Sequence, residues 1–483
     1  MTLMTGAQYE ASLRELNLVV YMFGKRLANV VDDPIIRPSL QAVAHTYDLA
    51  HRPEAEDLMT ATSHLTGRKV NRFTHIHQSR DDLVKKSKMG RLLGRETGCC
   101  FQRCVGLDAL NALSIVTYDI DQAHGTEYHP RFLKYLAYVQ ENDLTCDGAM
   151  TDPKGDRSLP PHQQPDPDQY LHVVEKRKDG IVVRGAKAHQ TGALNSHEII
   201  VMPTSAMREP DRDYAVSFAL PSDAPGIVYI MGRQSCDTRK LEEGLMDRGN
   251  FLFGGHEALV VFDNVFVPWE RVFMFQEYDF AGALVEKFAA YHRQSYACKV
   301  GVGDVLIGAA QTVAEYNRTE KASHIKDKII EMNHLNETLY CGCIACASEG
   351  QKEPSGTYAV NTLLANVHKQ NVTRFPYEIA RLAQDIAGGL MVTLPSEQDF
   401  KSPATGPWLE KYLRADQQIP TAHRMRILRL IENLTLGTAA VGYLTESMHG
   451  AGSPQAQRIM ISRLINMKEK QKAAQKLCGI EEE

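Results

Sequence analysis

The chain has 483 residues, of which 43% are hydrophobic and 23% charged, with a formal net charge of −5 at pH 7. This length exceeds what one hydrophobic core usually supports, so we expect two or three packed regions. The near-neutral charge, without a basic cluster among aromatic residues, excludes a nucleic-acid-binding protein, and no run approaches the roughly 18 apolar residues that a membrane helix needs.

The first third of the chain has the pattern of helices. Met1–Glu10 lacks a basic stretch followed by an apolar one, so we expect no secretory signal. Apolar residues at three- and four-residue steps predict the buried face of one helix: Leu13, Leu16, Val20, Phe23 and Leu27. Arg80–Gly94 and Val105–Gln122 are further helix candidates. We predict an N-terminal helical domain over residues 1–145.

The character of the sequence changes near Cys146, where Pro and Gly become frequent between short β-branched runs. Leu171–Val174 and Ile181–Arg184 flank Lys-Asp-Gly, which is a hairpin signal. Other runs have the composition of strands: Ile199–Met202, Tyr214–Leu220, Ile227–Met231 and Ala258–Val267. We predict an antiparallel, barrel-like β domain over residues 146–275.

Helical patterns return after this region, over residues 279–316, 321–349, 358–390, 422–441 and 455–477, with Pro and Gly between them. We predict a C-terminal helical bundle over residues 276–483. The order helix, β, helix predicts an α+β fold. It disfavours a nicotinamide-binding doubly wound sheet, which requires strands and helices to alternate.

The segment Gly148–Arg157 carries groups that can bind a flavin. Around Met150 and Thr151 it offers a turn, backbone donors and a hydroxyl, and Lys154 and Arg157 add two cations. Such a segment can hydrogen-bond an isoalloxazine edge and neutralise a pyrophosphate.

Two later segments add polar flavin contacts. Gly185–His197 supplies Gln190 and Thr191, and Phe262–Pro268 is a strand that ends in proline. Taken singly, each such segment is more often an ordinary turn or strand. In this order, between long helices, the three segments resemble those of the acyl-CoA dehydrogenase-like superfamily.

The superfamily resemblance extends to two glycine-containing loops. The first segment resembles the Thr-Glu-Pro flavin motif of the superfamily, with Asp152 of this chain in place of the Glu. Gly388 and Gly389 resemble the C-terminal Gly-Gly loop that reaches a flavin across a subunit interface in this superfamily, and Gly450 lies in a second such loop, Met448–Gly452. The alternative for both loops is a helix C-cap, which glycine also favours.

The cysteines indicate the compartment and a cofactor. Ten cysteines in a chain without a targeting signal suggest a reducing, cytoplasmic environment, with free thiols or metal ligands. Cys100 and Cys104 are four residues apart, and His292 and Cys298 lie together far downstream. If the two segments meet, they can hold one iron–sulfur cubane or one zinc ion. The alternative for the first pair is two core thiols one helical turn apart.

A rival ligand set lies at Cys341, Cys343 and Cys346, where the last two have metal-like spacing. Small apolar neighbours at helical spacing favour simple packing there, because free cysteine is commonly buried. We expect the other cysteines to be structural: Cys99, Cys146, Cys236 and Cys478.

Within the superfamily, Cys100-Phe-Gln-Arg-Cys104 and Tyr-His-Arg-Gln-Ser-Tyr-Ala-Cys-Lys (residues 291–299) closely resemble the 4-hydroxybutyryl-CoA dehydratase family. The match continues through residues 189–192, 232–239, 339–341, 374–378 and 445–454, and so covers essentially the whole chain. In one departure, only Ala297 separates Tyr296 from Cys298, where the family pattern has two small residues.

The resemblance implies FAD and a [4Fe-4S] cluster held by Cys100, Cys104, Cys298 and His292. It implies radical dehydration of 4-hydroxybutyryl-CoA to crotonyl-CoA and isomerisation of vinylacetyl-CoA to crotonyl-CoA. It also implies a homotetramer with the flavin near a subunit interface. Further residues match polar positions of the family's substrate cavity: Gln102, Thr191, Glu257, Tyr296, Lys299 and Glu446.

Chemistry suggests what these residues do. The β-hydrogen of a 4-hydroxyacyl thioester is not activated, so we expect a one-electron route through the flavin, with the cluster as Lewis acid on the leaving oxygen. His292 is the expected base for the α-proton. Tyr296 and Glu446 hold or protonate the departing hydroxyl, and Lys299 tunes their charge. Gln102 and Thr191 are the expected hydrogen-bond donors to flavin N5 or the thioester carbonyl.

Two other functions remain open from the sequence. A flavin-dependent aromatic monooxygenase of the 4-hydroxyphenylacetate type shares the architecture, but it has no use for the Cys/Cys/His/Cys set. A helical scaffold with a zinc site leaves the ordered flavin-like segments unexplained. Bound iron, sulfide and flavin would distinguish the three.

Overall fold

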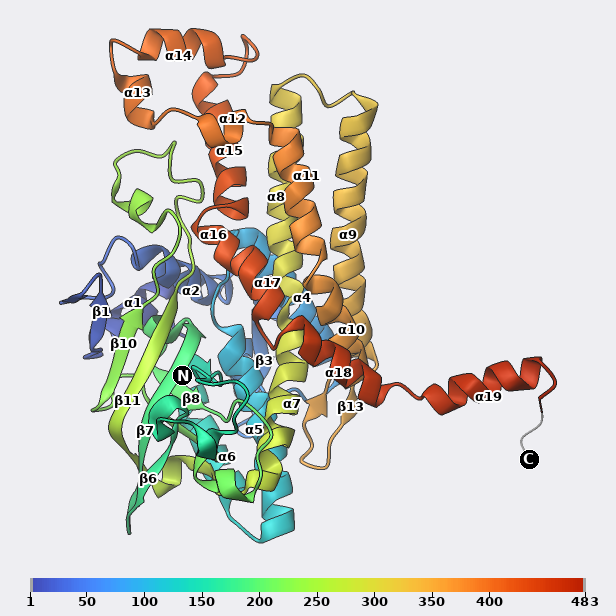
Figure 1. Ribbon diagram of the computed structural model, residues 1–483. Coiled ribbons are helices and arrows are strands. Elements are labelled where there is room, and N and C mark those ends of the chain that lie inside the picture. The colour runs from blue at the N-terminus through green and yellow to red at the C-terminus, as the bar shows by residue number, and fades with distance from the viewer. Residues whose placement is uncertain (1–2, 481–483) are drawn as a thin grey trace.

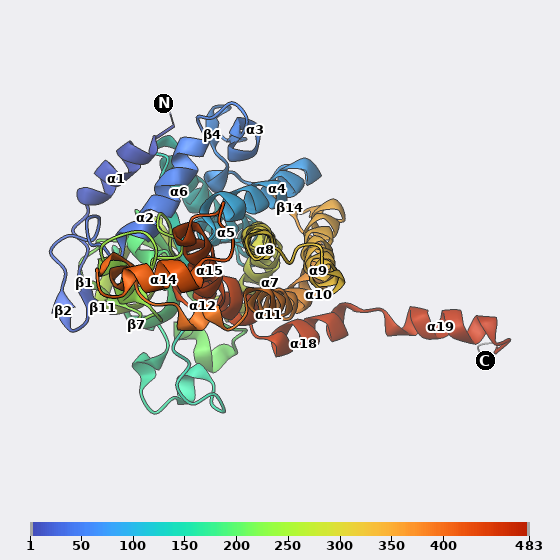
Figure 2. The same ribbon diagram turned by 90° about the horizontal axis from the view of Figure 1, so that it is seen from above.

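The computed structural model describes residues 3–480; residues 1–2, at the start of the segment expected to lack a secretory signal, lie outside the described part. Two β-sheets lie on one side of the molecule, and long helices stand beside them (Figure 1). Seen from above, α8 (Ala297–Tyr316) runs nearly along the line of sight among the other helices (Figure 2).

The N-terminal region is mainly helical. Its longer helices are α1 (Gly6–Arg14), α2 (Arg37–Leu49), α4 (Arg80–Thr97), α5 (Cys104–His124) and α6 (Tyr128–Glu141). It also holds the short α3 (Glu56–Met59) and the β3–β4 hairpin (Thr60–Thr62, Lys69–Asn71). The two helices predicted over 80–94 and 105–122 are confirmed by α4 and α5.

The helix predicted through Leu27 is wrong, because α1 already ends at Arg14. Residues Val20–Met22 form strand β1, with both end residues buried and Tyr21 exposed. That period-two burial belongs to a strand, and β1 pairs in parallel with β10 (Ile227–Met231). The apolar spacing fitted a helix only because strand and helix periods coincide at some positions.

The β region forms two sheets. The first has the order β2-β1-β10-β11-β7-β6 and the second β12-β9-β8-β5. Their remaining strands are β2 (Lys25–Arg26), β5 (Cys146–Ala149), β6 (His172–Lys176), β7 (Gly180–Thr191), β8 (Glu198–Val201), β9 (Val216–Pro221), β11 (Glu257–Pro268) and β12 (Val272–Phe275).

The predicted strands and the β6–β7 hairpin are confirmed, with His172 opposite Arg184. The expectation of a wholly antiparallel, barrel-like domain is wrong in two respects. β1–β10 and β5–β8 are parallel pairs, and each sheet is open, ending in unpaired edge strands such as β2 and β6. Two strands of the first sheet, β1 and β2, come from the N-terminal region.

The C-terminal region is again helical. Its long helices are α7 (Tyr278–Ser295), α8, α9 (Ser323–Ser348), α10 (Thr362–Val372), α11 (Phe375–Ala387), α15 (Thr421–Thr435), α18 (Pro454–Leu464) and α19 (Met467–Leu477). Shorter elements are β13 (Gln351–Lys352), β14 (Tyr358–Ala359), α12 (Leu390–Thr393), α13 (Glu397–Lys401), α14 (Gly406–Leu413), α16 (Thr438–Ala440) and α17 (Glu446–His449). The α+β class is confirmed, and the domain limits near residues 145 and 275 stay predictions.

The stretch Tyr278–Tyr316, which spans α7 and α8, is apolar and long enough to cross a membrane by length and composition. However, 72% of its most apolar window is buried inside the protein. It packs against α4, α5, α9 and α11, as a core helix of a soluble protein does (Figure 2).

Two backbone contacts fix the helices that carry the predicted cysteine ligands. A Cβ on Gly94 of α4 would lie 2.1 Å from the carbonyl oxygen of Cys298 on α8. A Cβ on Gly106 of α5 would lie 2.1 Å from the carbonyl oxygen of Cys146 on β5. Only glycine permits such close approach, so the backbone of the Cys298 helix packs directly on α4 and that of the Cys104 helix directly on β5.

A buried acid on β5 gives a prediction about stability. Asp147 is 1% exposed, and its Oδ2 has no hydrogen-bond partner. Burial raises the pKa of Asp147 to about 7. Because this folded-state pKa lies above the unfolded value, its contribution to stability is complete at low pH and is lost as pH rises from about 4 to about 7.

We therefore expect Asp147→Asn to be more stable than the parent protein, by a few kcal/mol above about pH 7 and by less near pH 5. Thermal unfolding at both pH values measures the difference. Asp179→Asn, an exposed carboxyl in the β6–β7 turn, is the control and should follow the parent. A gain that does not grow with pH contradicts the prediction.

Candidate active site

The two segments that the sequence singled out meet around one internal cavity. Its volume is about 50 Å³ for the centres of water-sized spheres, within an empty space of about 420 Å³ that includes open solvent. Its lining comprises Cys100, Gln102, Cys104, Val105, Thr191, His292, Ser295, Tyr296, Cys298, Lys299, Glu446 and Gly450. The α4–α5 loop, the α7–α8 junction, β7 and α17 therefore converge on one space.

The predicted ligands fit an iron–sulfur cluster in type and placement. Cys100, Cys104 and Cys298 are buried, and burial raises the pKa of each thiol. Thiolates in such a site require a positive partner, which iron supplies. The helix breaks at Tyr296, between α7 and α8, and Cys298 and His292 on either side of the break both line the cavity.

Within residues 3–480, no three His, Cys, Asp or Glu side chains converge as they would on a single metal ion. The four predicted ligands line one cavity, and their binding of a cluster stays a prediction. At the rival set, Cys343 and Cys346 are buried and Cys341 is exposed. Cys343 contacts His368, whose Nε2 is 3.2 Å from the thiol, in agreement with packing.

An ion pair and a phenol line the same cavity as the thiols. Lys299 Nζ donates to Glu446 Oε2 at 2.6 Å, and the Tyr296 hydroxyl donates to the Glu446 carbonyl at 2.9 Å. Burial lowers the pKa of Lys299, but the negative charge of Glu446 outweighs it and holds that pKa well above its usual value. Burial raises the pKa of Tyr296 well above 10.

Local backbone features place these groups. Glu446 directly follows a π-helical turn, Val441–Thr445, a feature that often marks functional sites. A Cβ on Gly450 would lie 1.9 Å from the Tyr296 hydroxyl, so only glycine lets the loop close over that phenol. Gly450 is also the C-cap residue of α17, so the C-cap alternative holds together with a place in the cavity wall.

Glu257 lies in a small adjoining cavity that shares Cys100 and Glu446 with the first. It accepts hydrogen bonds from the Thr191 hydroxyl at 2.7 and 2.8 Å. Burial, and then the nearby Glu446 carboxylate, raise the pKa of Glu257 well above 4.5. The raised pKa favours the protonated form of Glu257 beside the Lys299–Glu446 ion pair.

Gln102 lines the cavity with a left-handed backbone, φ 62°. Its side chain is bonded inside the protein: Nε2 donates to the Gly254 carbonyl at 3.2 Å, and Oε1 accepts from Asn195 Nδ2 at 2.8 Å. These bonds hold the amide against the cavity wall.

The two predicted flavin segments lie side by side. The Thr151 carbonyl accepts from the Ala188 amide at 2.8 Å, and Lys187 donates to the Met150 carbonyl at 3.0 Å. Lys187 also forms a buried ion pair with Asp152 at 2.9 Å. Asp152, in place of the usual Glu, therefore ties the first segment to β7.

The cations of the first segment suit an anionic ligand. Lys154 has a left-handed backbone, φ 77°, and its pKa is lowered by burial and then by the charge of Arg157. A phosphate group would relieve the repulsion between these cations. Gln190 is buried, and its Nε2 donates to the Ala188 carbonyl at 2.6 Å. The first segment, with Lys154 and Arg157, thus fits the phosphate part of FAD.

Gly388 and Gly389 lie outside the cavity. Gly388 ends α11 with φ 71°, and no atom lies within 4 Å of where a Cβ on either glycine would be. The loop is thus a helix C-cap on open surface in this chain, and a contact with a flavin of another subunit stays a prediction.

Sequence reasoning missed residues that hold the cavity wall. Lys369 on α10 donates to the Ser447 carbonyl at 2.6 Å, and its ammonium lies 4.6 Å from the centre of the Tyr296 ring. Arg293 on α7 donates to the Ala451 carbonyl at 3.1 Å. No sequence pattern indicates that Lys369 belongs to the cavity wall. Arg293 could have been predicted, because it directly follows His292.

Comparisons with known proteins agree with this site. Residues 5–274 match the family described as 4-hydroxyphenylacetate 3-hydroxylase N terminal, and residues 281–479 match its C-terminal counterpart. The 4-hydroxybutyryl-CoA dehydratase/vinylacetyl-CoA-Δ-isomerase of Clostridium aminobutyricum is 63% identical over 488 aligned residues, which cover 99% of this chain and 100% of that protein. The chain belongs to the 4-hydroxybutyryl-CoA dehydratase family.

The structural comparison agrees with this family. An oxygen-tolerant archaeal 4-hydroxybutyryl-CoA dehydratase from N. maritimus has a TM-score of 0.98 and 58% identity, and the match covers 100% of this chain and 96% of that one. The oxygenase component of 4-hydroxyphenylacetate 3-monooxygenase, complexed with FAD, has a TM-score of 0.84 and 24% identity, covering 98% of this chain and 99% of that one. That second likeness shows a shared fold, and the monooxygenases are the more distant relatives.

Proposed function

We propose that this protein dehydrates 4-hydroxybutyryl-CoA to crotonyl-CoA and isomerises vinylacetyl-CoA to crotonyl-CoA. The observation that carries the proposal is the 63% identity, over the whole chain, with a dehydratase/isomerase. The cavity adds support, because it joins the Cys/Cys/His/Cys set to an acid–base wall. An aromatic monooxygenase is disfavoured, since its relatives are only about one quarter identical, as in Thermus thermophilus at 26%.

FAD and a [4Fe-4S] cluster are the proposed cofactors. Cys100, Cys104, Cys298 and His292 would hold the cluster. The flavin would contact Met150, Thr151, Lys154, Arg157, Gln190 and Thr191, with Gly450 near its ring and Gly388 and Gly389 of another subunit near its far end. When bound, the flavin supplies one-electron chemistry and the cluster supplies Lewis acidity at the substrate hydroxyl.

The residues of the chain handle the protons. His292 Nδ1 is 2.8 Å from an Asp108 carboxylate oxygen, so Nε2 is the ring nitrogen available to the cavity. The same Nε2 would hold the cluster at rest, so in the proposed mechanism it would take the α-proton of the thioester only after leaving the iron, which imidazole does more readily than thiolate. Gln102 and Thr191 would border the thioester: Gln102 has a second Nε2–H beside the one that Gly254 accepts, and the Thr191 hydroxyl, which donates to Glu257, can still accept a hydrogen bond.

In the proposed mechanism the leaving hydroxyl of the substrate contacts Tyr296 and Glu446. Tyr296 provides a phenol O–H, because burial raises the pKa of this group and so keeps it protonated. Glu446 accepts a hydrogen bond from the departing group, while the Lys299 ammonium balances the carboxylate charge. Glu257 lies beside Glu446, and burial raises its pKa, which favours its protonated form. These roles require a water-poor cavity, and the lining residues are largely buried.

The proposed partners are a CoA thioester and copies of the same chain, as a cytoplasmic homotetramer with the flavin near a subunit interface. The C-terminal helix α19 supports the assembly, because it extends away from the body and none of its described residues is buried (Figures 1 and 2). Its exposed Met467 and Leu477 would pack on a neighbouring subunit.

One experiment tests the function. After anaerobic purification, iron, sulfide and flavin are counted, and 4-hydroxybutyryl-CoA is supplied as substrate. We expect roughly four irons and one FAD per chain and formation of crotonyl-CoA. Flavin without iron, together with oxygen-dependent hydroxylation of 4-hydroxyphenylacetate, would replace the proposal with the monooxygenase alternative.

A missed residue gives a further prediction. Lys369→Met keeps the side-chain volume but removes the bond to Ser447, next to Glu446. Losing one such bond is worth on the order of 1–3 kcal/mol, so we expect kcat for dehydration to fall about ten- to hundredfold. Lys328→Met, which breaks a surface ion pair with Asp385, is the control and should keep kcat. An unchanged kcat in Lys369→Met contradicts this prediction.

A further inference from the structure

Behind the cavity, one carboxylate joins three helices. Asp108 on α5 is fully buried. One of its oxygens, Oδ1, accepts from Lys86 Nζ of α4 at 2.6 Å. The other, Oδ2, lies 2.8 Å from His292 Nδ1 and 2.8 Å from the Ser295 hydroxyl, both of α7.

The placement of Asp108 relates it to the predicted ligands. It follows Cys104 by four residues on α5, so both side chains lie on the same helix face. His292 and Ser295 are one turn apart on α7, and both approach the same carboxylate oxygen. The carboxylate therefore reaches the imidazole from behind, while the ring borders the cavity in front.

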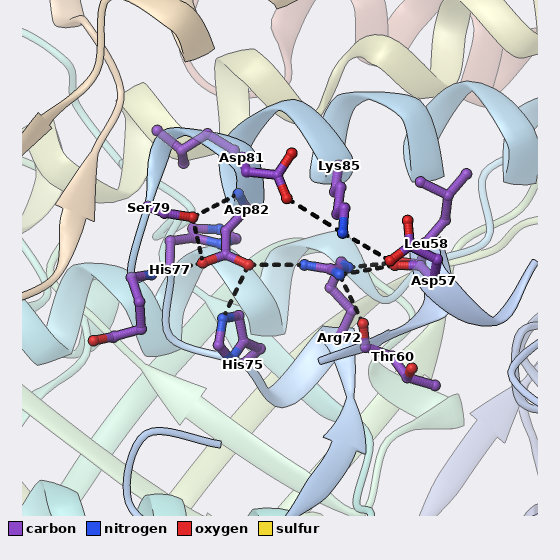
Figure 3. A network of polar contacts seen from close by, with 12 residues as sticks. Asp57, Leu58, Thr60, Arg72, His75, His77, Ser79, Asp81, Asp82 and Lys85 are labelled. Atoms are coloured by element: carbon purple, nitrogen blue, oxygen red, sulfur yellow. Dashed lines mark hydrogen bonds and ion pairs between the residues drawn. The ribbon is translucent and has the colours of Figure 1, made fainter. Parts of the chain in front are cut away.

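The lysine in this group is itself held in place. Lys86 Nζ also donates to the Tyr291 carbonyl at 2.8 Å. One turn earlier, Asp82 of α4 contacts Arg72 at 3.1 Å and His75 at 3.3 Å, which anchors the start of the helix (Figure 3). Lys86 thus balances the charge of Asp108 from a fixed position.

The alternative role for Asp108 is purely structural, as one half of an ion pair that holds α4 against α5. Such an ion pair would need only Lys86 and Asp108. It would not explain why Oδ2 is shared by His292 and Ser295. A carboxylate that accepts from Nδ1–H fixes the tautomer of a histidine and directs its Nε2 lone pair away, an arrangement that recurs behind metal-bound histidines.

We propose that Asp108 is a positioning residue, which fixes the tautomer and ring orientation of His292 so that Nε2 faces Cys100, Cys104 and Cys298. The proposal rests on the proposed function, in which His292 binds the cluster. Asp108 itself does not touch substrate; it acts through the imidazole, and Lys86 and Ser295 hold it in line.

The test compares Asp108→Asn with the parent protein, both purified anaerobically with ¹⁵N-labelled histidine. Electron-nuclear double resonance of the reduced cluster reads the coupling of the bound imidazole nitrogen. We expect Asp108→Asn to keep flavin but to lose or weaken that coupling. It should also release iron to a chelator about 10–100 times faster, the usual effect of removing such a partner.

Lys86→Met is the matched control. It removes the ion pair but keeps the Asp108–His292 contact, so we expect a lower thermal midpoint with the nitrogen coupling retained. If Asp108→Asn folds poorly, the double variant D108N/K86M removes both charges at similar volume and should again lose the coupling.

Unchanged coupling and unchanged iron release in Asp108→Asn or in the double variant would overturn the positioning role. Loss of the coupling in Lys86→Met to the same extent would also overturn it, because the ion pair alone would then suffice. A parent protein with a cluster but no histidine coupling would refute His292 ligation, and a parent without iron would refute the proposed function itself.

Discussion

The variant His292→Cys is expected to retain iron and flavin and to lose dehydration. Cysteine thiolate is itself a ligand of iron–sulfur clusters, so the site would still hold iron through four sulfurs. The variant lacks the imidazole that we propose as base for the α-proton. Removing a general base typically lowers the rate by about 10²–10⁴-fold.

The structure sharpens this expectation. His292 borders the cavity through its ring, and its other nitrogen is engaged with Asp108. A thiol at this position would neither reach as far nor keep the Asp108 contact. The measurements are iron and flavin content, together with initial rates of crotonyl-CoA formation from 4-hydroxybutyryl-CoA.

His129→Cys is the control for this variant, because it places a new thiol on α6, outside the cavity, and should keep both iron and rate. Normal turnover in His292→Cys would refute the base role. Loss of iron along with activity would show instead that the imidazole is needed to hold the cluster.

The sequence predicted much of this architecture because its periodic signals were strong. The charged helix α4, the long α5 and the β6–β7 hairpin follow from local patterns that no tertiary contact overrides. The region of Val20 was mistaken for a helix, because its strand exists only through pairing with β10, more than 200 residues away.

The convergence of Cys100, Cys104, Cys298 and His292 was expected from a family resemblance, and could not come from spacing alone. What brings them together is backbone contact, through Gly94 against Cys298 and Gly106 against β5. In the sequence, a glycine in a helix shows only a low helix propensity. Its role in a close contact becomes clear only when the neighbouring backbone is known.

The supporting residues were the hardest to predict. Asp108, Lys86 and Lys369 are charged residues in helices, and such residues are usually solvated. Here each is buried and bonded across helices. Their partners lie more than 20 residues away or on another helix, so no local pattern could mark them.

The second large effect is expected for Glu446→Gln. This variant removes the carboxylate that accepts from Lys299 at 2.6 Å, while its carbonyl can still accept from Tyr296. The Lys299 ammonium would then be buried without its counter-ion, and the leaving hydroxyl would lose its acceptor. We expect kcat to fall by about 10²–10⁴-fold, the range for a lost acid–base group.

Steady-state kinetics separate this effect from simple loss of structure. Glu432→Gln also neutralises a buried glutamate, one that pairs with Arg239 outside the cavity, and should lower the thermal midpoint without a comparable loss of kcat. Glu257→Gln should cost less than Glu446→Gln, because the raised pKa of Glu257 already favours its uncharged form and Gln can still accept from Thr191. If Glu257→Gln proves the more damaging of the two, the proton comes from Glu257, and Glu446 only holds Lys299 in place.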